Sequence, residues 1–156
     1  MRRQAQAGDV EAVNALRLRV RENILSRPQW LTPERTLEAI SETGRGWVWE
    51  EDGVILGFSV ANARERNIWA LFIEPGHEGL GIGRDLLEVA VQWLWSQSSR
   101  KIWLTTDHGT RAEGFYRAAG WHEVARLKNG EIRFELLFHP DSNARHTPLA
   151  AFGCLG

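Results

Sequence analysis

The sequence predicts an α/β fold built on a mixed sheet of about seven strands with helices on both faces. Residues 68–94 and 101–121 each read as a strand, a loop and a helix, which is the alternation that parallel strands require. Asp52-Gly53 and Asn129-Gly130 are dipeptides typical of two-residue hairpins, so they add antiparallel pairs. The expected order of elements is β-αα-βββ-α-β-α-ββ.

Length and composition indicate one globular domain. The chain has 156 residues, of which 43% are hydrophobic and 25% charged, and this suits a single core. No apolar run approaches the ~20 residues that span a bilayer, and the N-terminus lacks the apolar core of a signal peptide. We therefore expect no membrane partner. A net charge of −1 argues against a nucleic-acid partner. Cys154 is the only cysteine, which excludes an intrachain disulfide and fits the cytoplasm.

The N-terminal part is expected to hold a short strand and two helices. The strand is expected at residues 1–4, and Asp9 is a suitable N-cap for a helix over residues 10–25. Thr32-Pro33-Glu34 combines a capping hydroxyl, proline at the first helical position and an acid in the first turn, and predicts a helix over residues 33–44. One face of the first helix is basic, and we expect it to be solvated: Arg17, Arg19 and Arg21.

The rest of the chain is read from hydrophobic period and turn residues. Residues 68–73 are apolar and rich in β-branched and aromatic side chains, as in a strand buried on both faces. From His139 onward periodicity fails, so we assign residues 1–138 to the domain and 139–156 to a tail that is mobile unless a neighbour holds it. The other expected elements are strands at 47–51, 54–61 and 102–106, helices at 82–94 and 109–119, and hairpin strands at 121–127 and 132–138.

Alternating glycines follow the 68–73 strand at the start of a predicted helix. Gly79, Gly81 and Gly83 leave backbone N–H groups uncovered where free N–H groups and the helix dipole favour an anion. We expect a phosphorylated cofactor here, although a tight strand-to-helix turn is the structural alternative. The spacing matches neither the G-x-G-x-x-G dinucleotide fingerprint nor the G-x-x-x-x-G-K-S/T loop, which argues against a nucleotide- or dinucleotide-binding protein.

Two motifs together resemble the GNAT superfamily of N-acetyltransferases. Glu78-x-x-Gly81-x-Gly83 is similar to the family's pyrophosphate loop, Q/R-x-x-G-x-G/A, with Glu78 where the family has Gln or Arg. Residues 101–121 resemble the fifth strand and the pattern N-x-x-A-x-x-F/Y-Y-x-x-x-G-F/W, with Gly109 where the family often has Asn. The resemblance covers roughly residues 1–138 and implies the GNAT fold. The matching positions of the second motif are Ala112, Phe115, Tyr116, Gly120 and Trp121.

The resemblance implies direct transfer of an acetyl group from acetyl-CoA to a primary amine of a small molecule or a protein, without a metal. It also implies that the 68–73 strand splays from the 102–106 strand to admit the cofactor. A non-catalytic acyl-CoA-binding or sensor domain on the same fold is the alternative function, and the protein is expected to be a monomer or a homodimer. The implied cofactor-binding residues are Leu71, Phe72 and Ile73 for the pantetheine and thioester, and Gly79, Leu80, Gly81, Ile82, Gly83 and Arg84 for the pyrophosphate.

Tyr116 matches the family's general acid, which protonates the coenzyme A sulfur. A phenol suits this role because a buried hydroxyl keeps its proton at neutral pH. Tyr116 is also the only tyrosine of the chain. The alternative is that Phe115-Tyr116 is simply the core face of an amphipathic helix. The general base stays open among Glu74, His77, Asp107, His108 and a water molecule.

An acceptor pocket is expected between the first two helices, their loop and the hairpin strands. Tryptophan beside glutamate suits a cationic amine through cation–π contact and ion pairing, although such residues are more often core and solvated rim. The candidate wall residues are Glu22, Trp30, Trp49, Glu51 and Trp69.

Overall fold

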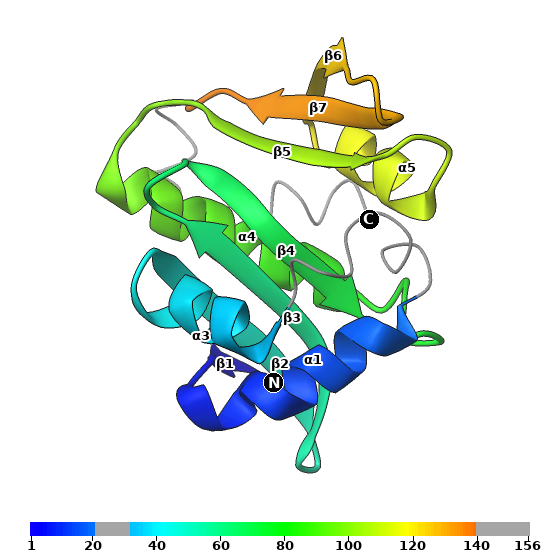
Figure 1. The fold of residues 1–156 in the computed structure, drawn as a ribbon. Coiled ribbons are helices and arrows are strands. Elements are labelled where there is room, and N and C mark those ends of the chain that lie inside the picture. The colour runs from blue at the N-terminus through cyan, green and yellow to red at the C-terminus, as the bar shows by residue number, and fades with distance from the viewer. Residues whose placement is uncertain (21–31, 140–156) are drawn as a thin grey trace.

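The computed structural model describes residues 1–20 and 32–139, and in this part of the chain seven strands form one sheet in the order β1-β2-β3-β4-β5-β7-β6 (Figure 1). Neighbouring strands are antiparallel except β4 and β5. The strands are β1 (Arg2–Gln4), β2 (Gly44–Glu51), β3 (Val54–Asn62), β4 (Asn67–Ile73), β5 (Ile102–Asp107), β6 (His122–Arg126) and β7 (Glu131–Leu136). The helices are the 3-10 helix η1 (Ala7–Asp9), α1 (Val10–Arg19), α3 (Pro33–Ser41), α4 (Ile82–Gln97) and α5 (Arg111–Ala118).

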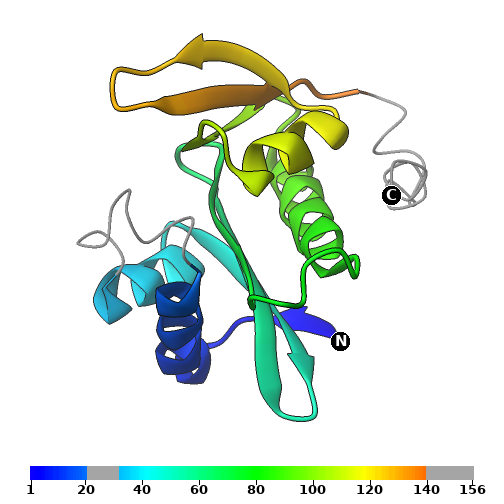
Figure 2. The same ribbon diagram turned by 90° about the vertical axis from the view of Figure 1, so that its right-hand side faces the viewer.

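Helices cover both faces of the sheet, which confirms the predicted fold class. α1 and α3 lie on one face, and α4 and α5 lie on the other (Figure 2). Each face has its own core. The α1-side core includes Val13, Leu16, Val48, Phe58, Val60 and Phe72, and the α4-side core includes Leu86, Leu94, Ile102, Leu104, Ile132 and Phe134. None of the helices in residues 1–20 and 32–139 is long and apolar enough to cross a membrane.

Local turn and cap chemistry follows the sequence prediction closely. Thr32 caps α3, because its hydroxyl accepts a hydrogen bond from the Arg35 amide at 3.2 Å. Asp52 and Gly53 both adopt left-handed φ angles, 50° and 79°, as a two-residue hairpin between β2 and β3 requires. Both predicted hairpins are therefore present, since β6 and β7 also pair as antiparallel neighbours.

The first helix begins at Val10 as predicted, but its C-terminal end and its cap differ from the prediction. α1 ends at Arg19 because Val20 is extended, with φ −90° and ψ 100°, and residues 21–25 lie outside the described residues. The Asp9 carboxylate does not cap α1. It accepts a hydrogen bond from the Gln6 amide at 2.8 Å instead, which closes η1. Of the predicted tail, residues 140–156 also lie outside the described part of the chain.

A β-bulge in β4 turns the end of this strand away from β5. Ala61 of β3 lies opposite Ile68, and Val60 lies opposite Ala70, which leaves Trp69 without a partner on β3. A bulge bends the strand that carries the extra residue and increases its twist. It therefore supplies the physical reason for the splay that the sequence resemblance implied.

The opposite end of the β4–β5 junction is closed and firmly held. The two strands pair at one position, Asn67 opposite Trp103, and the Trp103 amide donates to the Arg66 carbonyl at 3.1 Å. The Arg66 guanidinium donates hydrogen bonds to three carbonyl groups at the end of α4 and before β5: Leu94 at 2.6 Å, Ser98 at 2.9 Å, and Arg100. We call this junction the closed end.

The absence of a side chain at Gly57 lets α4 pack directly on β3. A Cβ atom at this position would lie 2.8 Å from Leu86 Cδ1 and 2.9 Å from Ile82 Cγ2, closer than packed carbon atoms approach. The Ser59 hydroxyl on the same strand donates to the Leu86 carbonyl at 3.0 Å. The first turns of α4, and with them the preceding glycine loop, are therefore fixed against the sheet.

An ion-pair network joins β1, η1 and β2. Arg3 donates to both carboxylate oxygens of Asp9, at 2.8 and 2.9 Å, and to Glu50 at 3.1 Å. The hydrogen bonds from Arg3, with a further one from the Gln6 amide, hold the pKa of Asp9 below its usual range. The ionised form of Asp9 thus stabilises the folded state.

We expect Asp9→Asn to lower the free energy of unfolding by about 1–2 kcal/mol near pH 7, because Arg3 and Gln6 lose a charged acceptor. A depressed folded-state pKa gives full stabilisation above the unfolded value of about 4, and this stabilisation is lost as the pH falls through the folded value. The gap between wild type and variant should therefore shrink below about pH 4 in urea unfolding. Glu38→Gln, at an exposed site of α3, is the control. An equal difference in the free energy of unfolding near pH 7 and below about pH 4 would contradict this account.

Candidate active site

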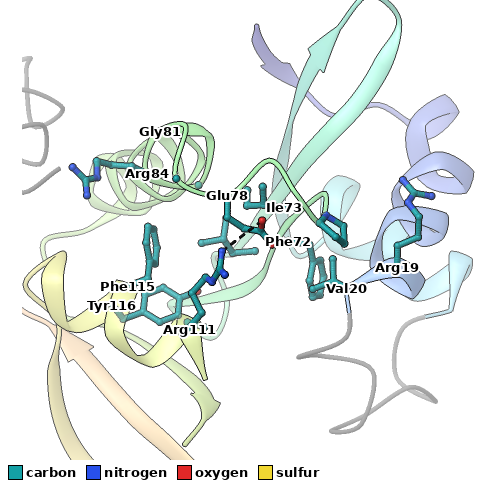
Figure 3. A pocket seen from close by; sticks show the side chains of 15 residues that line it. Arg19, Val20, Phe72, Ile73, Glu78, Gly81, Arg84, Arg111, Phe115 and Tyr116 are labelled. Carbon is teal, nitrogen blue, oxygen red and sulfur yellow. Dashed lines mark ion pairs between the residues drawn. The ribbon is translucent and has the colours of Figure 1, made fainter. Parts of the chain in front are cut away.

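A cavity of about 690 Å³ lies at the open end of the β4–β5 splay, between β4 and α5 (Figure 3). Its volume is in the range of small-molecule and cofactor sites. Four parts of the chain form its walls: the end of α1, the second half of β4, the loop into α4, and α5. The lining residues are Arg19, Val20, Leu71, Phe72, Ile73, Pro75, Glu78, Gly79, Gly81, Gly83, Arg84, Arg111, Ala112, Phe115 and Tyr116.

The glycine loop presents backbone amides to this cavity. Gly79 and Gly81 have left-handed φ angles of 79° and 87°, and Gly81 is the residue just before α4. Leu80 points to solvent with 69% exposure and Ile82 is buried in the core, so neither side chain lines the cavity. The loop therefore offers its N–H groups and the positive end of the α4 dipole, which together favour an anion. Arg84, in the first turn of α4, adds a cation to the same wall.

The end of β4 offers a free strand edge to the cavity. Leu71, Phe72 and Ile73 all line it, and in the described part of the sheet β5 pairs with β4 only at Asn67. The N–H and C=O groups of residues 71–73 on the β5 side therefore have no strand partner. Such an edge can bind an extended amide chain by adding it as a strand.

Tyr116 combines a core ring with a place on the cavity wall. The side chain is 7% exposed, and its ring contacts Phe115, Trp121 and Phe134 at centroid distances of 5.3, 6.0 and 6.2 Å. These neighbours fix the ring orientation. Burial raises the pKa of the Tyr116 phenol above its ordinary value, so the hydroxyl stays protonated at neutral pH. Tyr116 therefore occupies a position in the core and a position on the cavity wall at the same time.

The end of α1 forms a wall that the sequence interpretation missed. Arg19 lines the cavity, and its guanidinium donates hydrogen bonds to both carboxylate oxygens of Glu74, with N–O distances of 2.7 to 3.0 Å. Arg17, expected to be solvated, is buried with 4% exposure. Val20, beyond the last helical residue, lines the cavity beside Arg19. In sequence these positions look like an ordinary basic helix face, and only the packing of α1 beside β4 places them at the site.

The profile of the Acetyltransferase (GNAT) family matches residues 13–121. The chain belongs to this family. A stretch of 87 residues is 32% identical to the peptidyl-lysine N-acetyltransferase YiaC of Escherichia coli (strain K12). The match covers 56% of this chain and 56% of that protein, so it spans about half the length of the relative.

Solved structures share the fold at low sequence identity. The ribosomal-protein-S18-alanine N-acetyltransferase from Escherichia coli superposes with a TM-score of 0.71 at 17% identity, over 88% of this chain and 93% of that one. The PaiA N-acetyltransferase from Thermoplasma acidophilum, solved in complex with coenzyme A, gives a TM-score of 0.76 at 16% identity, over 88% and 98%. These matches support the GNAT fold that the sequence resemblance implies.

The predicted acceptor-pocket residues lie elsewhere or outside the described residues. The Trp49 indole donates to Glu51 at 3.0 Å and packs against the α4-side core, whereas Trp69 packs against the α1-side core. None of these three residues lines the cavity: the two tryptophans pack against the cores, and Glu51 is exposed at the end of β2. Glu22 and Trp30 fall within residues 21–31, which the structure does not describe. The contacts of the described residues thus give no support to the predicted tryptophan wall.

The candidate general bases are already engaged or set back from the cavity. Arg19 occupies both oxygens of Glu74, and the His108 ring nitrogen Nδ1 lies 2.9 Å from Glu113 Oε1. Neither these two residues nor His77 or Asp107 is among the described lining residues. None of the four candidate side chains therefore lines the described cavity wall.

Gly83→Glu tests the position of the phosphates. A Cβ atom at Gly83 would meet Ile73 at 3.5 Å, an ordinary contact, so the fold should tolerate the change. The added carboxylate would repel a diphosphate, and we expect coenzyme A binding to weaken at least about tenfold. Calorimetry measures the affinity and circular dichroism the fold. Gly83→Gln, of similar size but neutral, is the matched control, and an equal loss in both variants would point to steric blocking instead of charge.

Proposed function

We propose that this protein is an N-acetyltransferase that moves the acetyl group of acetyl-CoA directly to a primary amine. One observation carries the proposal: the free edge of β4, the glycine loop and Tyr116 line the same cavity. The first can hold an amide chain, the second an anion, and the third can donate a proton. Acetyl-CoA carries a matching group for each: an amide-rich pantetheine arm, a diphosphate at one end of that arm and a thioester at the other.

The hydrogen-bonding groups that line the cavity are of the kinds that each part of acetyl-CoA would need. The backbone amides of residues 79–84, with Arg84, would take the diphosphate. The backbone groups of Leu71, Phe72 and Ile73 would pair with the pantetheine arm, and an N–H group of this edge would polarise the thioester carbonyl. These residues hold the reacting carbonyl in place, and positioning of this kind supplies much of the rate acceleration when the thioester is already reactive.

In the transfer, one bond forms and one breaks at the carbonyl carbon, the amine loses a proton and the thiolate gains one. The neutral amine nitrogen forms a bond to the carbonyl carbon, and the carbon–sulfur bond breaks with its electrons on sulfur. Tyr116 donates its phenolic proton to the departing thiolate, and the raised pKa of Tyr116 ensures that this proton is present at neutral pH. We assign the removal of the amine proton to water, because Arg19 binds both oxygens of the Glu74 carboxylate and the His108 ring contacts the Glu113 carboxylate.

The acceptor is a primary amine of a protein or of a small molecule. Likeness to a peptidyl-lysine N-acetyltransferase supports a lysine side chain as the first acceptor to test. We propose that the acceptor enters from the α1 side of the cavity, where Arg19 and Glu74 form a bidentate ion pair. This pair keeps the α1 wall nearly neutral, so it neither strongly attracts nor repels an ammonium group.

A non-catalytic acyl-CoA sensor is the second candidate function. The observation that favours it is Glu78, an anion on the wall where the diphosphate would lie. Thiol release from acetyl-CoA in the presence of polyamines, amino acids, aminoglycosides and lysine-containing peptides separates the two functions. Amine-dependent release above the rate of hydrolysis supports the enzyme, whereas tight acetyl-CoA binding without release on any amine supports the sensor.

We expect Tyr116→Phe to lower kcat about 10²–10⁴-fold with little change in acetyl-CoA affinity, because the variant removes one oxygen and little volume. In the wild type, kcat should not fall between about pH 7 and 9 through loss of this proton, since the pKa of Tyr116 is raised. Steady-state and single-turnover kinetics measure both effects. Thermal unfolding of the variant is the control for packing. A kcat within about twofold of wild type, with chemistry rate-limiting, would make Tyr116 a core residue only.

A further inference from the structure

Glu78 stands on the cavity wall where an anionic ligand is expected. It belongs to the loop between β4 and α4, and 35% of its side chain is exposed. In Figure 3 its carboxylate points across the cavity toward Arg111, between the end of β4 and the start of α5. Both residues line the same cavity as Gly79 and Gly81.

The Glu78 carboxylate is bound by groups that also bind phosphate. Its Oε1 atom accepts a hydrogen bond from the Gly76 amide at 2.8 Å and lies 3.5 Å from Arg111 Nη1. Backbone hydrogen bonds from Glu78 itself and from Gly76 lower the pKa of Glu78, so it is ionised at neutral pH. Backbone amides and arginine are typical phosphate ligands, and here the Gly76 amide and Arg111 contact an internal carboxylate instead.

The ion pair also spans the open end of the splay. Glu78 follows β4, whereas Arg111 is the first residue of α5, after β5. Because β4 and β5 pair only at Asn67 and Trp103, this contact joins the two halves of the sheet at the end where a cofactor would enter. An incoming diphosphate would meet one anion and one cation, and the anion already neutralises the cation.

We propose that Glu78 is an internal anion that holds Arg111 in the cofactor-free protein and gives way to the diphosphate of the cofactor. The inference rests on the proposed function, since it assumes that coenzyme A is the ligand. On binding, Arg111 exchanges a carboxylate for a phosphate, and the displaced Glu78 repels the diphosphate. Glu78 thereby lowers the affinity for coenzyme A and speeds its release after transfer.

Glu78→Gln tests the inference by removing the charge and keeping the size. Loss of one like charge close to a phosphate should tighten coenzyme A binding about fivefold at low salt. Pantetheine, which lacks the diphosphate, should bind both forms equally. Asp85→Asn is the matched control, because Asp85 lies in the first turn of α4 and pairs with Arg2 at 3.0 Å without lining the cavity. Its coenzyme A affinity should equal that of the wild type.

Arg111→Gln provides the second arm. Arg111 is needed as a phosphate ligand under the proposal, so its loss should weaken coenzyme A binding in both the wild-type and the Glu78→Gln backgrounds. Coenzyme A affinity in Glu78→Gln that is equal to or weaker than wild type would overturn the inference and leave the proposed function standing. So would equal tightening in Asp85→Asn or toward pantetheine. Absence of coenzyme A binding in wild type and variants alike would overturn both.

Discussion

The guanidinium of Arg66 holds the closed end on which the cavity depends. Its three carbonyl partners come from the end of α4 and from the segment before β5. A cation there also complements the helix dipole. Because α4, β4 and β5 are tied together at this point, the bulge at Trp69 opens a gap of defined width at the far end. The cavity is the consequence of one closed junction and one extra residue.

Close packing then fixes the positions of the glycine loop and of Tyr116 on either side of this gap. Gly57 lets α4 rest directly on β3, so the glycine loop stands at a fixed distance from the free edge of β4. On the other side of the gap, the aromatic neighbours of Tyr116 fix the phenol on α5. The two halves of the site therefore belong to two halves of the sheet. The binding of a ligand that contacts both halves therefore depends on the width of the gap between β4 and β5.

Features encoded by adjacent residues were predictable, and features created by distant contacts were not. Thr32-Pro33-Glu34, Asp52-Gly53 and the glycines before α4 act through their own backbone and neighbours, so local chemistry identifies them. The bulge at Trp69 depends on the register with β3, which the sequence of β4 alone does not contain. Arg19 reaches the site through Glu74, 55 positions further along the chain. The face on which a strand tryptophan lies likewise needs the helix packing.

The backbone of Arg66 has a consequence for protein engineering. Among the described residues other than glycine, Asp52 and Arg66 have left-handed φ angles, 50° and 61°. A common route to greater thermostability replaces such residues by glycine, which removes strain of about 1 kcal/mol or more. At Asp52, in an exposed turn, the exchange touches only the turn. At Arg66 the same exchange would relieve the backbone strain, but it would also remove the guanidinium that holds the closed end together. A glycine at Asp52 can therefore relieve strain without affecting the site, whereas a glycine at Arg66 relieves strain at the expense of the site.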